Sequence, residues 1–330
     1  MFKYTSIFIQ RYCPRQCPYC IAKDVRGKRK LRVHEWQKFF EWADKQGFEF
    51  HLILGNESLA YPWIVDFVKM MRGRYYTLYT TFPEPYHSKV TEEVIKAGVY
   101  SLSCGVDYIV TEDFTDDYIK SGHGVEVMCQ IKNRIPDHQL TVTIHRKNFR
   151  VLPQIMGVLT RMGFITGASF VEYSHDGKHD FFPTKDKLLD YIFTEEDKEE
   201  FDFVMNLVAD GIEEGKYFVQ PPPEYFRDAV KYAIDISWHC SKPLILSIEE
   251  DGSLRLCAYR KGEELPNYTI FDLVEDRITL EEVRKLWKKE SKKCPGCYWS
   301  YPYICEYWEK HDSEFGKKVI QVHASKYFKR

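Results

Sequence analysis

The stretch that decides the fold is YTSIFIQRYCPRQCPYC, residues 4–20. It begins with an apolar, strand-like segment, Tyr4 to Gln10, and ends with Cys13, Cys17 and Cys20 at C-x3-C-x2-C spacing. Three thiolates at this spacing can hold three irons of a [4Fe–4S] cube, whereas most electron-carrier cubes have four cysteine ligands. The fourth iron would be open to chelation by a small molecule. The loop therefore predicts a reactive cluster rather than a simple electron carrier.

The alternative for these thiols is a zinc site. Zinc in proteins is usually held by four Cys or His ligands. The nearest histidine, His34, lies 14 residues beyond Cys20 and within a predicted helix. The spacing therefore favours the iron–sulfur cluster over zinc.

Length and composition indicate a globular protein. The chain has 330 residues, 44% hydrophobic and 29% charged, with a net charge of −2, which suits one large domain or a domain with an appendage. The sequence has neither a run of about 18 apolar residues nor an evident signal peptide. We therefore expect no membrane-spanning segment and a cytoplasmic location. In a reducing interior the ten cysteines should bind metal rather than form disulfides. Basic segments at 26–32 and 281–330 would suit a nucleic acid, but solvated helix faces explain them too, and nucleic acid is not favoured.

Strand-like and helix-like patterns alternate through the first 175 residues. The best-marked helix is Val33 to Gln46, where Trp36, Phe39, Phe40 and Ala43 fall at i, i+3, i+4 and i+7. Six strand–helix repeats follow one another, and such alternation implies a parallel sheet. Six repeats are too few for a closed eightfold barrel. The cysteine loop follows the first strand and therefore lies at a carboxyl end, where the chemistry of parallel α/β sheets collects.

The second part of the chain carries another cysteine set. The run Pro221-Pro222-Pro223 marks a boundary, which divides the chain into residues 1–222 and a smaller α+β extension, residues 223–330. Two short apolar runs, Leu244 to Ile248 and Leu254 to Leu256, flank an Asp-Gly turn and predict a hairpin. The hairpin would place the next cysteine beside a later C-x2-C pair. The cysteines of this part are Cys240, Cys257, Cys294, Cys297 and Cys305, and four of them suit either a zinc ribbon or a second cluster.

The first cysteine loop resembles that of the radical S-adenosylmethionine (radical SAM) enzymes. The resemblance rests on the spacing, on the aromatic Tyr19 just before the third cysteine, and on the place of the loop after the first strand. It implies an α/β fold with a partial (β/α)6 TIM-like barrel. It also implies a [4Fe–4S] cluster on Cys13, Cys17 and Cys20, with SAM bound to the open iron through its amino and carboxylate groups.

The later cysteines resemble the SPASM and shortened twitch extensions of the same enzymes. There a Gly-x4-Cys hairpin and a C-x2-C pair hold auxiliary [4Fe–4S] clusters, and too few thiols remain here for the two clusters of a full SPASM domain. In the related aminocyclitol dehydrogenases four cysteines bind the auxiliary cluster and leave no iron open. The resemblance therefore implies a cluster that relays electrons, with the ligands Cys240, Cys257, Cys294 and Cys297. Without Cys240 one iron would be open, as in the cyclase that makes the molybdopterin precursor. Cys305 would then be an exchangeable ligand or a plain buried thiol, and Cys104 and Cys129 are expected in the core.

The resemblance also implies a SAM site. Family members have a Gly-Gly-Glu-Pro run after the second strand, and the run Gly55-Asn56-Glu57-Ser58 keeps its first Gly and its Glu. Gly55 and Glu57 would therefore bind the SAM amino group, although a turn with a helix-capping Asn or Ser is the alternative. Tyr19 would lie against the adenine, and Ser103 and Asn148 would contact the ribose or carboxylate. Thr80-Thr81-Phe82 departs from the Thr-Asn-Gly of many relatives, and no catalytic residue is assigned. Candidate acid–base or substrate groups at strand ends are Asp107, His145, Arg146 and Glu172.

The implied function is reductive cleavage of SAM to a 5′-deoxyadenosyl radical, which abstracts hydrogen from a substrate. A reducing partner such as flavodoxin or ferredoxin would supply the electron. The expected substrate is a small molecule or nucleotide, because the first cluster cysteine is residue 13 and no leader-peptide-binding domain is expected before it. Peptide or protein maturation is the alternative. A non-catalytic iron–sulfur or zinc-binding protein is the alternative from another class.

Overall fold

The structure is a computed structural model that describes residues 2–15, 17–20, 29–54, 56–83, 88–107, 123–173, 185–257, 268–294, 296–297 and 299–311. Its strands are β1 (Tyr4–Phe8), β2 (Phe50–Leu54), β3 (Tyr76–Thr80), β4 (Ser101–Gly105), β5 (Asp137–Ile144), β6 (Ile165–Phe170), β7 (Ile245–Ile248) and β8 (Leu254–Arg255). Its α-helices are α1 (Val33–Lys45), α2 (Ile64–Met70), α3 (Lys89–Lys96), α5 (Gly124–Ile131), α6 (Leu152–Arg161), α7 (Lys198–Glu213), α8 (Pro223–Arg227), α9 (Ala229–Ala233), α10 (Ile270–Val274), α11 (Leu280–Glu290) and α12 (Ser300–His311).

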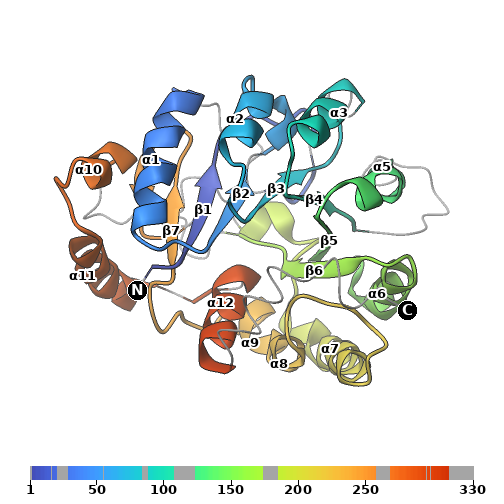
Figure 1. The fold of residues 1–330 in the computed structure, drawn as a ribbon. Coiled ribbons are helices and arrows are strands. Elements are labelled where there is room, and N and C mark those ends of the chain that lie inside the picture. Colours follow the sequence, from blue (N-terminus) through green and yellow to red (C-terminus); the bar gives the residue numbers. More distant parts are fainter. Residues whose placement is uncertain are drawn as a thin grey trace.

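The strands form one eight-stranded sheet in the order β6-β5-β4-β3-β2-β1-β7-β8. Strands β1 to β6 are parallel to their neighbours, in chain order. Helices α1, α2, α3, α5 and α6 run along the outer side of this curved sheet (Figure 1). The α/β fold with a partial barrel that the sequence predicts is therefore confirmed.

Helix α1 shows why the alternating pattern produces this arrangement. Its four apolar positions, Trp36, Phe39, Phe40 and Ala43, are all fully buried. Each large side chain buried in this way stabilises the fold by about 1.5–3 kcal/mol. The helix ends before Gly47, whose φ of 77° lies in the left-handed region that glycine adopts without strain.

The predicted hairpin is present and belongs to the main sheet. Strand β7 lies parallel to β1, with Tyr4 opposite Ile245 and Ile7 opposite Ile248, and β8 is antiparallel to β7. The sheet therefore includes strands from both sides of the boundary predicted between residues 222 and 223. The division of the chain into two domains at this boundary stays a prediction. Helix α12 contacts both α8 and β6, so the last described helix also packs on the barrel.

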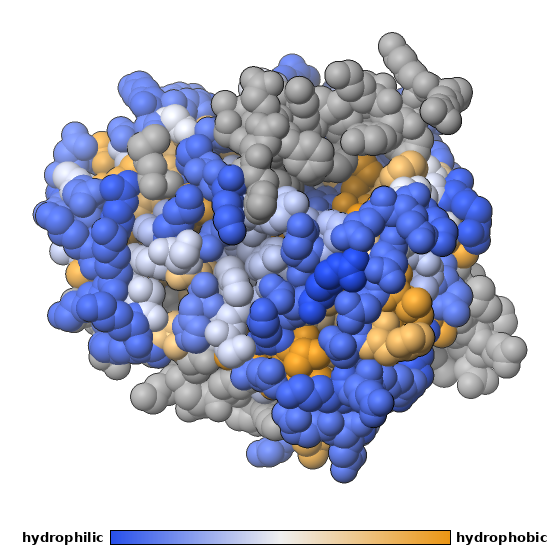
Figure 2. All heavy atoms as spheres, turned by 90° about the horizontal axis from the view of Figure 1, so that it is seen from below, coloured by the Kyte–Doolittle hydropathy of each residue, from blue (hydrophilic) through white to orange (hydrophobic). Residues whose placement is uncertain are grey.

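Within the described ranges, no helix has the length and apolar character needed to cross a bilayer. The face seen from below in Figure 2 is largely hydrophilic, with apolar side chains in small separate patches, as is normal for a folded protein surface.

Candidate functional site

The topology places the two cysteine sets at opposite ends of the sheet. Strand β1 leads directly to Cys13, so the first set lies at the carboxyl ends of the parallel strands. Cys240 precedes β7, which runs parallel to β1, and therefore lies at the amino ends. Cys257 follows β8, which is antiparallel to β7, and reaches the same amino end.

A cavity of about 330 Å³ runs into the barrel from the first set, and Cys13, Cys17 and Cys20 all line it. The three thiols are half-buried. The pKa of Cys13 is raised to about 12: burial raises it most, a backbone hydrogen bond from Arg15 lowers it, and the charges of Glu57, Cys20 and Cys17 add to the rise. Three soft thiol donors on one cavity wall are the donor set of a [4Fe–4S] cluster with one open iron.

In the part of the chain that the structure describes, no three Cys, His, Asp or Glu side chains converge on a point that could hold one metal ion. A tetrahedral zinc needs such convergence at bond lengths of about 2.3 Å. A cube is larger, and each of its irons takes a different thiolate.

A buried ion cluster anchors the start of the cysteine loop to the β7–β8 turn. Nε and Nη2 of Arg11 donate to the two carboxylate oxygens of Glu249 over 2.9 and 2.6 Å, and its backbone N–H donates to Glu250 over 2.9 Å. Arg255 pairs with the same Glu249 carboxylate. The Arg11 guanidinium also lies 3.5 Å from the ring centre of Phe8. Removing one partner of such a buried pair costs about 3–5 kcal/mol, so this contact fixes the loop.

Sequence reasoning missed this contact. Arg11 and Glu249 are 238 residues apart, and neither lies in a pattern that indicates a partner. A weak signal existed in the charged pair Glu249-Glu250, which directly follows a strand and is nevertheless buried.

The cavity wall has an apolar half and a neutral polar half. Apolar side chains come from β1, β2 and the start of α12, and neutral polar ones come from β3, β5 and the segment after α7. Of the described residues that line the cavity, Arg15 and Glu172 carry charge. The apolar members include Phe8, Phe50, Leu52, Trp299, Tyr301 and Ile304, and the polar ones include Thr77, Tyr79, Gln139, Thr141 and Gln220.

Glu57 joins the carboxyl ends of β2 and β3. Its side chain is fully buried. Oε1 accepts hydrogen bonds from Leu59 N–H (3.0 Å) and the Thr80 hydroxyl (2.6 Å), and Oε2 accepts from Thr81 N–H (2.9 Å) and the Thr81 hydroxyl (3.0 Å). Burial raises the pKa of Glu57, and these donors oppose that rise. Asn56, Thr80 and Thr81 line the cavity, so Glu57 holds its wall.

The expectations for Gly55 and for Phe82, which both come from comparison with family motifs, have different outcomes. Gly55 lies outside the described residues. Phe82, at the place where many radical SAM enzymes have glycine, has a φ of 48° and is fully buried. Its N–H donates to the Thr80 hydroxyl over 2.9 Å. Phe82 therefore adopts the left-handed backbone conformation that glycine favours, and a residue with a side chain adopts it at some cost in strain.

The other three residues expected at the SAM site lie in different surroundings: Tyr19 lines the cavity, whereas Ser103 and Asn148 are buried in hydrogen-bond networks. Tyr19 lines the cavity, with its ring centre 5.2 Å from that of His145 and 5.4 Å from that of Tyr191. Ser103 is buried on β4 and shares a 2.9 Å hydrogen bond with the Thr141 hydroxyl. Asn148 is buried and bridges the loop after β5, accepting from His145 N–H and donating to the backbone of Asp107 and Thr143; its role at SAM stays a prediction.

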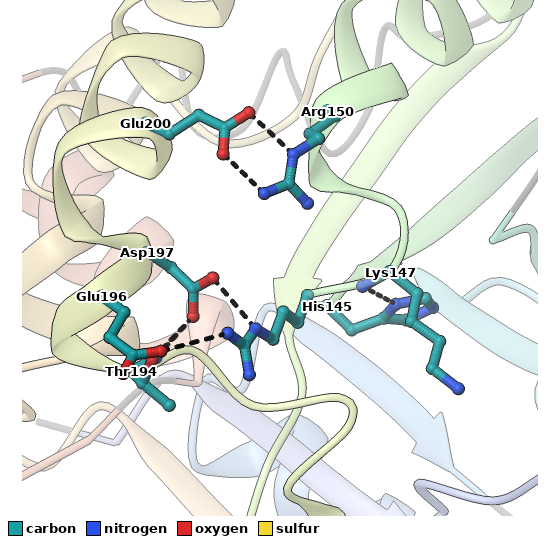
Figure 3. A network of polar contacts seen from close by, with 8 residues as sticks. His145, Lys147, Arg150, Thr194, Glu196, Asp197 and Glu200 are labelled. Carbon is teal, nitrogen blue, oxygen red and sulfur yellow. Dashed lines mark hydrogen bonds and ion pairs between the residues drawn. The ribbon is translucent and has the colours of Figure 1, made fainter.

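Figure 3 shows the polar network beyond β5. Arg146 donates to Asp197 over 2.9 Å, and Asp197 also accepts from Thr194, which begins the segment leading into α7. Arg150 forms two hydrogen bonds with Glu200 on α7. Arg146 therefore ties the loop to α7. Among the four candidate acid–base residues Arg146, His145, Asp107 and Glu172, it is Glu172 that lines the cavity.

Four of the later cysteines gather at the amino end of the sheet. Burial raises the pKa of Cys240 well above its usual value, and the negative charges of Cys297, Cys257 and Cys294 add to that rise. Cys297 is affected in the same way by Cys257 and Cys294. The four thiols are thus close enough to interact, and four soft donors fit a closed [4Fe–4S] cluster.

The turn between Cys294 and Cys297 packs directly on the segment before Cys240. Cys297 N–H donates to Trp238 O over 2.8 Å, and His239 Nε2 lies 3.1 Å from Cys294 O. Gly296 has a φ of 125°, and a Cβ there would lie 1.8 Å from the carbonyl oxygen of Ile236. Only glycine permits this approach.

Of the remaining cysteines, Cys305 belongs to the hydrophobic cluster against which Cys257 and Cys297 also pack. Cys305, on α12, is fully buried beside Tyr301, and burial raises its pKa well above the usual value. Cys104 is buried in β4, as expected, and Cys129 packs on the core from α5. The choice of Cys240 over Cys305 as the fourth ligand stays a prediction, and the grouping of the thiols favours it.

With this geometry in place, comparison with known proteins identifies the class. The Radical SAM superfamily model matches residues 7–147, which run from the end of β1 through β5 and include the first cysteine loop. The part of the chain that holds the first cysteine loop is therefore a radical SAM domain, as the sequence predicts. None of the curated proteins compared with the chain matches its sequence.

Solved structures of similar fold include SuiB from Streptococcus suis and anSMEcpe. SuiB bound to S-adenosylmethionine gives a TM-score of 0.62 at 12% identity, covering 95% of this chain and 75% of that one. SuiB bound to its precursor peptide SuiA gives 0.61 at 13%, covering 97% and 76%. Native anSMEcpe with bound AdoMet and Kp18Cys peptide gives 0.57 at 12%, covering 97% and 98%. In a further SuiB structure the chain spans 66% of the SuiB length.

Proposed function

We propose that the protein is a radical SAM enzyme that modifies a peptide or protein. The observation that carries the proposal is the similarity over nearly the whole chain to SuiB with its precursor peptide and to anSMEcpe with a bound peptide. A peptide substrate therefore replaces the small molecule or nucleotide as the main hypothesis. The barrel cavity, which the cysteine loop lines together with α12, would receive the reacting side chain.

The residues of this chain have distinct parts in that function. Cys13, Cys17 and Cys20 would hold a [4Fe–4S] cluster, which, with SAM bound, supplies a 5′-deoxyadenosyl radical for hydrogen abstraction. Tyr19 would lie against SAM at the cavity wall. Glu57 would act indirectly, by holding the ends of β2 and β3. The apolar half of the cavity would exclude water and stray hydrogen donors from the reacting group.

The later thiols would hold a second cluster in a twitch-like or SPASM-like extension. Cys240, Cys257, Cys294 and Cys297 would leave no iron open, so their cluster would relay electrons rather than bind substrate. Their mutual electrostatic influence supports this set. An external donor such as flavodoxin or ferredoxin would reduce the first cluster.

The proposal is tested with anaerobically reconstituted protein, SAM and dithionite. A pool of random-sequence peptides should raise 5′-deoxyadenosine formation above the rate without substrate and should yield peptides of altered mass. A pool of nucleosides and aminosugars is the comparison, and the Cys17→Ala variant is the control for cluster-dependent chemistry. Stimulation by nucleosides or aminosugars alone would contradict the peptide assignment.

A further inference from the structure

An amide pair lies at the inner end of the cavity. Gln139 stands near the amino end of β5, and its Nε2 donates to Oε1 of Gln220 over 2.9 Å. Gln220 is held beside β6, because its N–H donates to Thr166 O over 2.9 Å and Val219 bridges Thr166. Gln139 is only 8% exposed. Both side chains line the cavity, so the pair is a built feature of its wall.

Hydroxyl groups continue this polar wall across the sheet. Gln139 Nε2 lies 3.5 Å from the Thr141 hydroxyl, which in turn lies 2.9 Å from the Ser103 hydroxyl. Hydrogen bonds from Tyr79 also involve Thr141 and Ser103, and burial raises the pKa of Tyr79, which keeps that phenol neutral. The wall is therefore polar and uncharged throughout.

The amide pair has hydrogen-bonding capacity to spare. A glutamine amide offers one acceptor oxygen and two donor hydrogens. Among the described residues, no hydrogen bond uses Oε1 of Gln139 or Nε2 of Gln220. An acceptor and a donor are thus left on a cavity wall, and together they complement a group that can both donate and accept.

The charged residues that line the cavity, among those described, come from segments that follow Cys13 and β6. These residues, Arg15 and Glu172, have their backbone at the carboxyl ends of the strands, and the charge of Glu172 is also close enough to Cys297 to raise the pKa of that thiol. At the Gln139 position, the other lining residues that β5 contributes, Thr141 and Thr143, are neutral. An ionised side chain that reached this position would lose its hydration without gaining a counter-ion, which is strongly unfavourable.

A glycine on β6 makes room for the amide. A Cβ at Gly167 would lie 2.2 Å from Gln139 Nε2 and 2.8 Å from the Thr141 hydroxyl oxygen. Both contacts are with side-chain atoms, and the first is the end of a flexible side chain. A larger residue at this position would therefore displace the amide without disturbing the backbone.

We propose that Gln139 and Gln220 form a specificity pocket for an uncharged hydrogen-bonding side chain, a carboxamide or a hydroxyl, on the substrate peptide. The pocket accepts such a side chain, disfavours a purely apolar one because its own amide groups would be left unpaired, and rejects a charged one. The peptide nature of the substrate rests on the proposed function. The selection of a neutral polar group rests on the pocket itself.

The pocket is tested by the binding of capped amino acids, N-acetyl-X-amides with X as Gln, Ser, Leu, Glu or Lys. Binding is measured by saturation-transfer NMR on the reconstituted protein with SAM and without reductant. The Gln and Ser probes should bind at least about tenfold more tightly than the Glu and Lys probes, because only the charged probes lose hydration uncompensated. The Leu probe should fall between them. Equal binding of neutral and charged probes, or binding of none, overturns the proposal.

Three variants sharpen the test. Gln139→Glu adds a charge without a change of shape and should raise binding of the Lys probe at least about tenfold, by providing a counter-ion. Gly167→Ala displaces the Gln139 amide. It should weaken binding of the Gln and Ser probes and leave binding of the Leu probe unchanged. Gln154→Glu, on the exposed face of α6, is the matched control and should leave the profile unchanged. Identical profiles for Gln139→Glu and Gln154→Glu overturn the proposal.

The binding test and the turnover test fail separately. The capped amino acids need no turnover, so a neutral preference that depends on Gln139 supports the pocket even where the peptide pool gives no product. That second result would overturn only the peptide function. Peptides modified at charged side chains would support the function and overturn the pocket.

Discussion

Replacing Glu57 with glutamine tests how the cavity wall is held. Both carboxylate oxygens of Glu57 accept a backbone N–H, from Leu59 on one side and Thr81 on the other. Glutamine has the same shape but offers an NH2 group in place of one oxygen. In either orientation, that group faces a backbone N–H, so two donors oppose each other in a fully buried site.

The size of the effect follows from these contacts. One buried N–H loses its acceptor in Glu57→Gln, and such a loss costs about 1–3 kcal/mol of unfolding free energy. The removal of a buried charge offsets part of this cost, because burial disfavours the ionised form of Glu57. We therefore expect a net loss of about 1–2 kcal/mol, within the range of a broken buried hydrogen bond.

Urea unfolding of the anaerobically reconstituted protein, followed by circular dichroism, measures this loss. Glu200→Gln is the matched control, because Glu200 is exposed and paired with Arg150, and it should leave the unfolding free energy nearly unchanged. An unfolding free energy for Glu57→Gln equal to that of the wild type would refute the reasoning. The same network predicts a functional effect: Glu57→Ala should weaken SAM binding more than Ser58→Ala, by equilibrium dialysis, since Thr80 and Thr81 lose their anchor.

Three further predictions concern the thiols. Reconstituted wild-type protein should hold about eight irons and the Cys17→Ala variant about four, measured by iron analysis, and this variant should form no 5′-deoxyadenosine; zinc at the second set would contradict the two-cluster hypothesis. Cys240→Ala should impair turnover and change the electron paramagnetic resonance of the second cluster, whereas Cys305→Ala should do neither, and the reverse result would exchange their roles. Gly296→Ala should abolish the second cluster while SAM binding persists, because its Cβ would lie 1.8 Å from Ile236 O; an intact cluster in this variant would mean that the turn can shift.

The sequence predicts the fold well because its evidence is local and repeated. Each strand–helix unit carries its own periodic pattern, as in α1, where four apolar positions identify the buried face and all four are buried. The cysteine loop needs only its own spacing and the preceding strand. The hairpin at β7 and β8 is also local, but its place beside β1 is not. A short buried strand such as Ile245–Ile248 is consistent with any neighbour, so its partner could not be predicted.

The site is harder to predict because most of its contacts are distant in sequence. Gln139 and Gln220 are 81 residues apart, and neither lies in a motif. Glu57 was recognised from its motif, yet the structure gives its carboxylate four protein donors, which no spacing could reveal. Phe82 shows the converse case. The sequence departs from the glycine of many relatives, while the backbone keeps the left-handed conformation that glycine would favour.

The start of α12 makes the two halves of the molecule depend on each other. Trp299, Tyr301 and Ile304 line the barrel cavity, and Trp299 stands only two residues after Cys297, whose sulfur lies 3.4 Å from the Trp299 backbone N–H. A shift at the second thiol set is therefore transmitted to the cavity wall through a few covalent bonds. Loss of turnover in a Cys297 variant would combine a lost cluster with a deformed cavity. Cys240 lies on a different segment and is not itself one of the residues that line the cavity, so its replacement reports on the cluster more directly.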